Sequence, residues 1–375
     1  MKILQVLPTL NSGGVEKGTL EIAQAIVAAG HDSWVVSAGG RLVDTLEREG
    51  SHHHCWDLGR KSLTSLLQIP KLRRWLIQEQ FDVIHVRSRM PAWLVWLAWR
   101  KIPKTQRPRL VSTVHGLHSV NRYSQIMTCG ERVIAVSKTG LAYIRENYPN
   151  TDPDKIRLIY RGIDPKQYPF DYVPGEEWRS TWFTTYPMLA NRFVVTLPGR
   201  LTRLKGHLGF LQIIQALKAA GIPVTGLIVG GEDPKRKGYA EEIRAKTAEL
   251  GLQEDIIFTG HRADIMNIYK VSNAVVSLSS KPESFGRTVL ETLSINVPVI
   301  GYAHGGVAEI LTTLYPHGAV TPGDTSAVTD RLKAIYQGDA PAILENKQFL
   351  LANMQQQTLD LYNELAGEQK HHCIN

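Results

Sequence analysis

The chain has 375 residues, of which 43% are hydrophobic and 21% are charged. This size and composition favour two globular domains, each with its own core. Three scattered cysteines, Cys55, Cys129 and Cys373, exclude a disulfide framework and a recognisable zinc site. No apolar run approaches the ~20 residues that span a bilayer, and the opening residues are typical of a β-strand rather than a signal peptide. We therefore expect reduced thiols and a cytoplasmic protein.

The positive charge is concentrated in the first half of the chain. Residues 1–163 contain 23 Lys and Arg against 13 Asp and Glu, a net of +10, whereas the rest of the chain carries −2. Much of the excess lies in residues 71–75 and 93–109, and the second segment also contains Trp93, Trp96 and Trp99. Aromatic rings beside cations favour the headgroup zone of an anionic membrane. Alternatively, these tryptophans pack a surface helix against the core. No nucleic-acid motif accompanies the basic face, so we expect no nucleic acid partner.

Short apolar runs alternate with helical patterns along both halves, which is typical of doubly wound parallel sheets. In the first half the runs are residues 3–7, 34–38, 81–86, 110–116 and 132–137. In the second half they are residues 193–199, 224–231, 256–260, 273–280 and 298–306. Ligands of such sheets bind beyond the carboxyl ends of the strands, so the loops that follow these runs are the candidate sites.

Several loop segments in the first half have local interpretations. Gly13 and Gly14 follow the first strand and permit close approach of the backbone to a phosphate or a sugar. The run His52 to His54 is interpreted as the approach to a short surface strand, because it lacks ligand partners at metal spacing. Asp152 to Asp154 form a DxD-like triplet within a polar loop, and we predict a turn there.

Two strand-to-helix junctions in the second half carry the chemistry. Residues 197–207, LPGRLTRLKGH, place Arg200 and Lys205 in one loop, where two cations can neutralise a diphosphate. Residues 282–291, PESFGRTVLE, place Glu283 and Glu291 around Gly286 at the start of a helix. A helix N-terminus suits a phosphate, and each carboxylate can accept two hydrogen bonds from a vicinal diol. A nucleotide sugar satisfies all of these groups.

In their order and spacing, these segments and HGGVAE at 304–309 resemble the retaining glycosyltransferases of family 4, which have the GT-B fold. The similarity extends to LNSGGVEKG at 10–18, His115–Gly116, the segment that ends at Ser137, and YRGID at 160–164. The resemblance implies an α/β protein with two facing Rossmann-like domains and a cleft between them. Residues 1–168 are expected to form the acceptor-side domain and residues 190–347 the nucleotide-sugar domain. Residues 348–375 are expected to form a crossover helix and tail.

The resemblance also implies roles for individual residues. It assigns His115 to the vicinity of the transferred sugar, Glu283 to the sugar hydroxyls and Glu291 to the ribose. Catalysis is expected to depend on His115, Arg200, Lys205 and Glu283, with His118 and Arg122 as acceptor contacts. The residues expected to bind the donor are Gly13, Gly14, Arg200, Lys205, Arg262, Glu283, Ser284, Phe285, Gly286 and Glu291.

The expected reaction is transfer of a hexose from a nucleotide-diphosphate sugar to a glycolipid, such as lipopolysaccharide core, at the inner face of a membrane. The protein would position charge for the departing diphosphate, so no metal and no cofactor are expected. Arg161 departs from the family pattern, in which Asn is common at this position. Two alternatives stay open: a nucleotide-sugar epimerase on the same fold, and a non-catalytic nucleotide-sugar-binding membrane scaffold.

Overall fold

The computed structural model describes residues 1–11, 13–232 and 237–372. The chain divides into two compact units. The first unit combines Met1–Gly162 with Phe349–Asn375, and the second is Ile163–Gln348. The boundary therefore lies between Gly162 and Ile163, six residues before the predicted end of the first domain at residue 168. The predicted crossover segment belongs to the first unit, and Cys373 lies outside the described residues.

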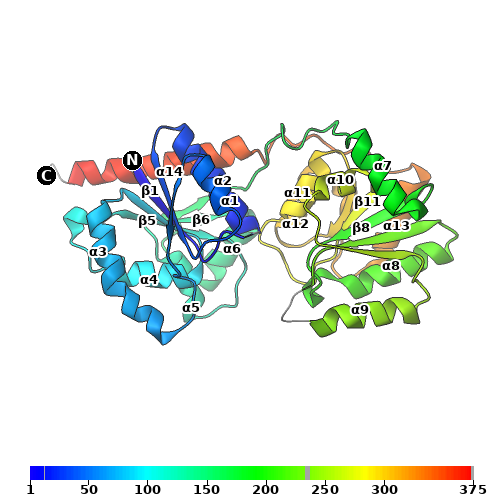
Figure 1. The fold of residues 1–375 in the computed structure, drawn as a ribbon, viewed down its shortest axis with the longest axis horizontal. Coiled ribbons are helices and arrows are strands. Elements are labelled where there is room, and N and C mark those ends of the chain that lie inside the picture. The colour runs from blue at the N-terminus through cyan, green and yellow to red at the C-terminus, as the bar shows by residue number, and fades with distance from the viewer. Residues whose placement is uncertain (12, 233–236, 373–375) are drawn as a thin grey trace. The chain divides into compact units, whose positions relative to one another are not determined.

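The first unit is built on a seven-stranded parallel sheet with the order β3-β2-β1-β4-β5-β6-β7 (Figure 1). The strands are β1 (Lys2–Val6), β2 (Asp32–Ser37), β3 (His52–Cys55), β4 (Val83–Val86), β5 (Arg109–Val114), β6 (Arg132–Ala135) and β7 (Ile156–Leu158). Its helices are α1 (Gly14–Ala28), α2 (Val43–Arg48), α3 (Ile69–Glu79), α4 (Arg89–Trp99), α5 (Arg122–Gln125), α6 (Lys138–Asn147) and α14 (Leu351–His372).

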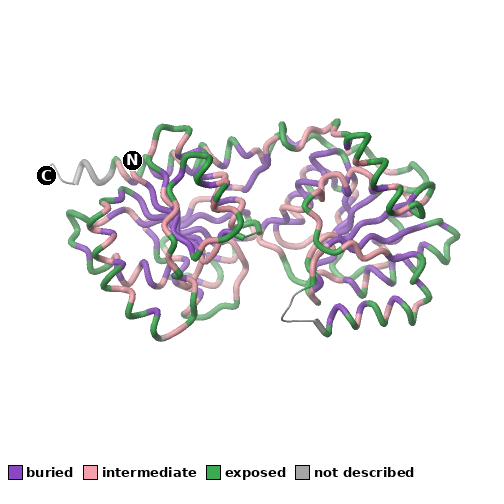
Figure 2. Tube along the Cα trace, viewed as in Figure 1, coloured by how far each residue is buried: buried purple, intermediate pink, exposed green. Residues whose placement is uncertain are grey.

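The inner strands of this sheet, β2, β1, β4, β5 and β6, are mostly buried on both faces (Figure 2), which explains why they appear in the sequence as short apolar runs. Successive side chains point to opposite faces, so neighbours in one strand enter different cores. Ile3 packs in the cluster that contains residues of α1 and α14, whereas Leu4 packs in the cluster that contains residues of α3 and α4. The same division separates Val83 from Ile84.

The C-terminal helix α14 is an integral part of the first unit. Its Leu361, Tyr362 and Leu365 are buried against the sheet, and each such side chain contributes about 1.5–3 kcal/mol of hydrophobic stabilisation. The Tyr362 hydroxyl lies 2.5 Å from Nδ1 of His85 in β4. The helix is thus held to the sheet by apolar packing and by at least one buried polar contact.

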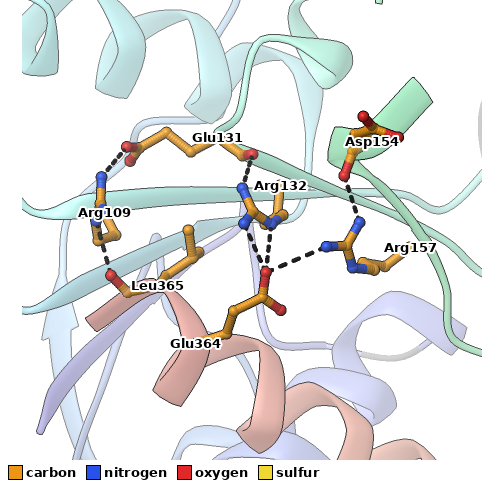
Figure 3. A network of polar contacts seen from close by, with 7 residues as sticks. All are labelled: Arg109, Glu131, Arg132, Asp154, Arg157, Glu364 and Leu365. Atoms are coloured by element: carbon orange, nitrogen blue, oxygen red, sulfur yellow. Dashed lines mark hydrogen bonds and ion pairs between the residues drawn. The ribbon is translucent and has the colours of Figure 1, made fainter. Parts of the chain in front are cut away.

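A network of polar contacts adds to this attachment (Figure 3). Oε1 of Glu364 lies 2.6 Å from Nη2 of Arg132 in β6 and 3.2 Å from Nη2 of Arg157 in β7. Arg109 of β5 donates from Nε to the carbonyl of Leu365 at 2.9 Å. The arginine hydrogen bonds lower the pKa of Glu364, whose side chain is 40% exposed. Three neighbouring strands are therefore connected to one turn of α14.

The tryptophans of α4 pack inside the unit, as the second of the two sequence hypotheses proposed. Trp93, Trp96 and Trp99 are partly buried against the core beneath α4. The indole N–H of Trp93 donates to the carbonyl of Tyr123 at 3.0 Å, and that of Trp99 donates to a backbone carbonyl at 2.6 Å. Arginine side chains cover the rings of Trp96 and Trp99. These rings serve packing, which weakens the argument for a membrane contact through them.

The second unit contains a six-stranded sheet with the order β10-β9-β8-β11-β12-β13. Its strands are β8 (Phe193–Pro198), β9 (Val224–Val229), β10 (Ile256–Gly260), β11 (Ala274–Ser277), β12 (Val299–Tyr302) and β13 (Ala319–Val320). Its helices are α7 (Glu176–Thr185), α8 (His207–Ala219), α9 (Lys237–Glu249), α10 (Ile265–Lys270), α11 (Arg287–Ser294), α12 (Gly305–Leu314) and α13 (Thr325–Gln337). All of the pairings between these strands are parallel. The prediction of two doubly wound parallel sheets is confirmed.

Two local predictions have clear outcomes. The side chain of Asp152 accepts a hydrogen bond from the backbone N–H of Asp154 at 2.9 Å within a short 3-10 turn, so the predicted turn is confirmed. His52 to His54, by contrast, form the edge strand β3 itself rather than its approach. The reason is backbone pairing with β2, together with stacking of the His54 ring on Trp75 at 4.8 Å between centroids.

Candidate functional site

The second sheet places the two chemistry-bearing loops side by side. Strands β8 and β11 are neighbours, and the strand order reverses between them, which is where open α/β sheets bind ligands. The loop after β8 carries Arg200 and Lys205, and the loop after β11 carries Glu283 to Gly286. Both loops lead directly into a helix, so both contribute backbone N–H groups and a positive dipole end.

Lys205 and Glu283 form an ion pair at this edge of the sheet. Nζ of Lys205 lies 2.7 Å from Oε1 of Glu283, and the hydroxyl of Ser279 donates to the same oxygen at 2.6 Å. Burial alone would raise the pKa of Glu283, but Lys205 and Ser279 favour the carboxylate and lower its pKa below the ordinary value. Glu283 is therefore ionised at neutral pH, and Lys205 is oriented by it.

Glycines allow a second loop to approach Glu283 closely. Gly305 has φ +64°, and a Cβ at this position would lie 2.4 Å from the carbonyl oxygen of Glu283. A Cβ at Gly306 would lie 2.4 Å from Cα of Phe285, and the N–H of Gly306 donates to the carbonyl of Glu283 at 2.8 Å. The HGG segment thus fixes the backbone of the loop that carries Glu283. Nε2 of His304 lies 2.8 Å from the carbonyl oxygen of Ser279, so the histidine holds the same region.

The remaining part of the acidic motif enters helix α11. Ser284 is half-buried, Phe285 is 4% exposed, and Gly286 caps the helix with φ +98°. Glu291, on the buried face of α11, is 8% exposed. Its Oε1 accepts a hydrogen bond from the Tyr168 hydroxyl at 3.0 Å and lies 3.0 Å from Nε of Arg287. Glu291 is therefore not an ordinary exposed helix residue, because its buried side chain is held in one orientation by Tyr168 and Arg287.

The two arginines predicted on this side have different surroundings. Arg200 is exposed in the loop after β8. Arg262 makes a bidentate contact with Asp264, with nitrogen to oxygen distances of 2.8 and 2.6 Å. Its guanidinium also lies 5.5 Å from the ring centroid of Trp182. These contacts show that the Arg262 side chain serves packing within the second unit; the assignment of Arg262 to the donor site stays a prediction.

In the first unit, the predicted glycine loop leads into α1. Gly13 has φ +136°, a conformation that favours glycine, and Gly14 is the first residue of the helix. Both are exposed. The carbonyl oxygen of Gly14 accepts a hydrogen bond from Nη1 of Arg161 at 2.5 Å. Arg161 is therefore part of the support for this loop, although no sequence motif singles it out for that role.

His115 lies directly after β5, where Arg161 also reaches it. Nη2 of Arg161 lies 2.6 Å from Nδ1 of His115. Burial, reinforced by Arg161 and Arg87, holds the pKa of His115 well below its ordinary value. Burial also lowers the pKa of His118, helped by Arg89, to about 4. Both imidazoles are therefore neutral at physiological pH.

The predicted acceptor contacts His118 and Arg122 flank a short loop after His115. His118 is half-buried, and its backbone carbonyl accepts a hydrogen bond from the Tyr143 hydroxyl at 2.7 Å. Arg122 is exposed at the start of α5. Ser137, which belongs to another of the family-like segments, is fully buried and caps α6 by accepting from the N–H of Gly140 at 2.9 Å. Such a cap is worth about 1 kcal/mol, so a structural role accounts for Ser137.

A small cavity of about 30 Å³ lies beneath His115. Its lining includes His85, Arg87, Thr113 and Arg161. This volume accommodates roughly two water molecules, and the Nε atom of Arg87, which has no hydrogen-bond partner among the described residues, offers a donor to them. The cavity is too small for a sugar, and His115 is itself one of its lining residues.

The described residues contain no group of three or more His, Cys, Asp and Glu side chains arranged to hold a metal ion. Within the same residues, no helix has both the length and the apolar character needed to cross a membrane.

Comparison with known families accounts for both units. Residues 12–167 match the family model described as Glycosyltransferase Family 4, and residues 181–347 match the one described as Glycosyl transferases group 1. The chain is a glycosyltransferase of the family 4 type with the GT-B fold. In this glycosyltransferase, the two matches together leave uncovered only residues 1–11, residues 168–180 within the second unit, and residues 348–375.

Solved structures agree over nearly the whole length. A glycosyltransferase from Rickettsia africae ESF-5 is 29% identical, with a TM-score of 0.84 over 97% of this chain and 98% of that one. Anabaena Alr3699/HepE in complex with UDP-glucose is 20% identical, with a TM-score of 0.82 over 97% of this chain and 100% of that one. At that identity the second likeness supports the fold alone.

Curated relatives are more distant. The uncharacterized glycosyltransferase MJ1607 of Methanocaldococcus jannaschii is 24% identical over 344 residues, which are 83% of each chain. The lipopolysaccharide core biosynthesis mannosyltransferase LpsB of Rhizobium meliloti is 26% identical over 224 residues, covering 59% of this chain and 58% of LpsB. Relatives at this distance establish the class of enzyme and leave the substrates of this glycosyltransferase to be proposed.

Sequence reasoning missed four residues that support the predicted ones. Ser279 and His304 fix the loop of Glu283, Tyr168 orients Glu291, and Arg161 connects His115 with the glycine loop. Only His304 and Arg161 lie within segments that carried a signal, namely HGGVAE and YRGID. Tyr168 contacts a glutamate 123 positions away along the chain, which a single sequence does not reveal. Ser279 lies only four positions before Glu283, but nothing in the sequence marks its hydroxyl as the partner of that carboxylate.

Proposed function

We propose that this glycosyltransferase transfers a hexose from a nucleotide-diphosphate sugar to a lipid-linked glycan such as lipopolysaccharide core, with retention of anomeric configuration. The observation that carries the donor half is the Lys205–Glu283 pair at 2.7 Å, located where β8 and β11 end. A cation held by a carboxylate at a helix N-terminus is suited to a sugar diphosphate, because the carboxylate faces hydroxyls and the cation faces phosphate.

Each residue has a defined part in this proposal. Lys205 and Arg200, with the N-terminus of α11 at Gly286, stabilise the negative charge that develops on the departing diphosphate. Glu283 accepts hydrogen bonds from hydroxyls of the transferred sugar. Glu291 accepts them from the ribose, in the orientation set by Tyr168 and Arg287.

The chemical step balances without a protein nucleophile. The acceptor hydroxyl oxygen forms a bond to the anomeric carbon on the face from which the diphosphate departs. The bond between the anomeric carbon and the diphosphate oxygen breaks, and the departing phosphate takes the hydroxyl proton. We propose that the step requires no metal, since Lys205, Arg200 and the helix N-terminus supply the positive charge.

The donor nucleotide is proposed to be UDP. The complex of Alr3699/HepE with UDP-glucose supports a UDP-hexose for a protein of this fold. The nearby Arg262 would face the base, although its side chain is bound to Asp264. A screen therefore begins with UDP-hexoses and includes GDP- and ADP-hexoses for comparison.

The acceptor proposal has two supports. One is the similarity to LpsB, a mannosyltransferase of lipopolysaccharide core biosynthesis. The other is a surface of the first unit on which Leu66 is 44% and Leu67 is 78% exposed. Exposed Arg60, Lys71 and Arg74 flank these leucines in the sequence. Exposed leucines with basic neighbours favour an anionic membrane surface, and we propose that this surface brings the enzyme to its lipid-linked acceptor at the cytoplasmic face.

A mass-spectrometric screen tests the donor and the acceptor together. Purified protein is incubated with each nucleotide sugar, with and without intact or delipidated lipopolysaccharide, in the presence and absence of EDTA. The proposal predicts release of nucleoside diphosphate and a hexose added to the lipopolysaccharide, both unaffected by EDTA. Conversion of one nucleotide sugar into its epimer without acceptor would instead establish the epimerase alternative. Binding of nucleotide sugar without turnover would establish the scaffold.

Site variants test the donor assignment. Glu291→Gln is expected to weaken nucleotide-sugar binding by about 10- to 100-fold, because a hydrogen bond to a charged group is worth about 1.5–3 kcal/mol. The matched control is Glu254→Gln, an exposed glutamate of the same unit. Isothermal titration calorimetry measures both. Equal affinity in Glu291→Gln and wild type would refute the ribose contact.

A further inference from the structure

Arg161 connects two predicted site elements of the first unit. The residue is 8% exposed. One terminal nitrogen, Nη1, donates to the carbonyl oxygen of Gly14 at 2.5 Å, and the other, Nη2, lies 2.6 Å from Nδ1 of His115. A Cβ at Gly14 would lie only 2.9 Å from Nη1, so the glycine permits this approach. The planar guanidinium therefore fixes the position of the glycine loop relative to the histidine.

The contact with Arg161 determines where the proton of His115 resides. A guanidinium in a protein stays protonated and can only donate hydrogen bonds. The Nδ1 atom of His115 must therefore accept, and it must be unprotonated. In a neutral imidazole the proton then resides on Nε2. His115 is consequently neutral and presents an N–H group from its far nitrogen.

The surroundings maintain that state. The charged and titratable groups that face His115 are Arg161, Arg87, His85 and His118, and all of them disfavour the imidazolium. Burial is the largest cause of the lowered pKa of His115, and Arg161 is the largest of the charged causes. Removal of the Arg161 charge should therefore raise the pKa of the histidine toward its ordinary value.

We propose that Arg161 is a positioning residue that keeps His115 a neutral hydrogen-bond donor through Nε2–H, and that His115 consequently does not act as a general base. The Nε2 atom of His115 is buried, so its N–H group reaches a sugar hydroxyl or a phosphate oxygen only where the surroundings of the ring open, and neither nitrogen is available to take the proton of the acceptor hydroxyl. That proton must go to the departing phosphate, as the proposed reaction requires. The identity of the substrate oxygen rests on the proposed function, whereas the tautomer does not.

An arginine achieves this where a shorter amide would not. An amide side chain has both a donor and an acceptor, so it could turn and stabilise either tautomer of a histidine. It also carries no charge that would oppose protonation of the ring. Arg161 excludes the protonated ring and the other tautomer at once. Lysine retains the charge and the donor but loses the second, fixed donor to Gly14.

The tautomer is tested directly by nitrogen-15 NMR of histidine side chains in the full-length protein. A His115→Gln variant assigns the His115 signals by difference. Wild type and Arg161→Lys are expected to show an unprotonated Nδ1 and a protonated Nε2 from pH 6 to pH 8. Arg161→Gln is expected to show mixed tautomers or a ring that protonates within that range. A protonated Nδ1 in the wild type would overturn the proposal, whether or not any sugar is transferred.

The pH profile of turnover supplies a readout that a purely structural role would not move. Arg161→Gln is expected to lose kcat several-fold at pH 8, where the neutral ring can carry its proton on Nδ1 and so lack the Nε2–H donor, and to recover part of that loss at pH 6, where a protonated ring again has a proton on Nε2, with KM for the nucleotide sugar little changed. Arg161→Lys is expected to retain most activity at both pH values. Circular dichroism confirms that each variant is folded. An equal loss at every pH in folded Arg161→Gln would contradict the proposed positioning role.

Discussion

Lys205 and Glu283 are separated by 78 residues in the sequence, yet Nζ of the lysine lies 2.7 Å from Oε1 of the glutamate. Lys205 lies in the loop after β8, and Glu283 lies in the loop after the neighbouring strand β11. The fold therefore brings the two charges together without a ligand. The pair therefore affects stability as well as the proposed catalysis, and the two effects can be measured separately.

Replacement of the cation in this pair should destabilise the protein in a pH-dependent way. Lys205→Met leaves a largely buried carboxylate without its cation, which costs roughly 1–3 kcal/mol at pH 7. Because the folded-state pKa of Glu283 is lowered, the stabilisation is present above the ordinary carboxyl value of 4.5 and is lost as the pH falls through the folded value. Urea unfolding at pH 7 and at decreasing pH measures this.

The difference between wild type and Lys205→Met should shrink in acid. The control is Lys347→Met, whose side chain is 83% exposed and which should change the free energy of unfolding by less than about 0.5 kcal/mol. A deficit of the same size at every pH would mean that the lost stability comes from packing of the lysine stem and not from the ion pair.

Gly305 should tolerate no side chain. Gly305→Ala combines a positive φ with a Cβ placed 2.4 Å from the carbonyl oxygen of Glu283, so the acidic loop must shift. Gly221→Ala is the matched control, because its φ of +78° imposes a similar conformational cost and no heavy atom lies within 4 Å of the added Cβ. We expect Gly305→Ala to lose nucleotide-sugar binding by at least about 10-fold, the equivalent of roughly 1.4 kcal/mol.

Calorimetric titration and thermal unfolding of both variants measure the effect. Gly221→Ala should bind normally and lose about 1 kcal/mol of stability, the cost of a left-handed backbone for a residue with a Cβ. Normal binding by Gly305→Ala would show that the HGG segment does not control the position of Glu283.

The attachment of α14 should depend more on Tyr362 than on Glu364. Tyr362→Phe removes a fully buried hydroxyl from His85 and should cost about 1–3 kcal/mol. Glu364→Gln breaks exposed ion pairs with Arg132 and Arg157, so it should cost less than about 1 kcal/mol. The hydrogen bonds from Arg132 lower the pKa of Glu364, so its contribution is present above pH 4.5 and disappears below the lowered value.

Thermal unfolding in low and high salt distinguishes these variants. Added salt should diminish the effect of Glu364→Gln, because screening weakens exposed charge pairs, and should leave that of Tyr362→Phe unchanged. If Glu364→Gln were the more destabilising variant, the polar network of Figure 3 would contribute more to the stability of the α14 attachment than the buried contact of Tyr362 does.

The exposed leucines should control membrane association. Leu66→Ser together with Leu67→Ser should reduce binding to vesicles of anionic phospholipid by about 10-fold or more, since each side chain contributes apolar area at the surface. Turnover of a water-soluble acceptor fragment should be unchanged. Trp96→Phe is the control, because the Trp96 ring packs inside the unit beneath Arg100. Vesicle sedimentation at low and high salt provides the measurement, and unchanged binding by the leucine variant would remove this surface from consideration.

Much of the fold could be predicted from the sequence, because each buried parallel strand is a short apolar run that ends at Gly, Ser or a charged residue. The predicted strand before His115 and the predicted helix after Gly286 are both present. The edge strand His52 to Cys55 was not recognised, since its polar side chains hide a pairing that depends on β2. The chain divides at Gly162, a few residues before the predicted end of the first domain at residue 168, and no composition change in the sequence marks that point.

The part of the candidate site that could be predicted consists of residues that lie within sequence motifs. Lys205, Glu283 and Glu291 lie in buried or half-buried surroundings with defined partners. The supporting residues were not predictable, because the contact of Tyr168 with Glu291 joins segments that are distant in the sequence, and the contact of Ser279 depends on how its own loop turns back toward Glu283. Arg161 was noticed only as a departure from a family pattern, and its contact with His115 gives that departure a physical meaning.

The residues that complete the first unit are synthesised after the second unit. Its apolar surface around Ile3, Ile22 and Val111 is covered by α14, which a ribosome produces only after the whole of Ile163–Gln348. At roughly 5–20 residues per second, that surface stays uncovered for about ten seconds or longer while the second unit emerges. A chaperone that shields the nascent first unit during this interval would therefore be expected to raise the yield of folded protein, and early termination before Leu351 would leave an aggregation-prone fragment.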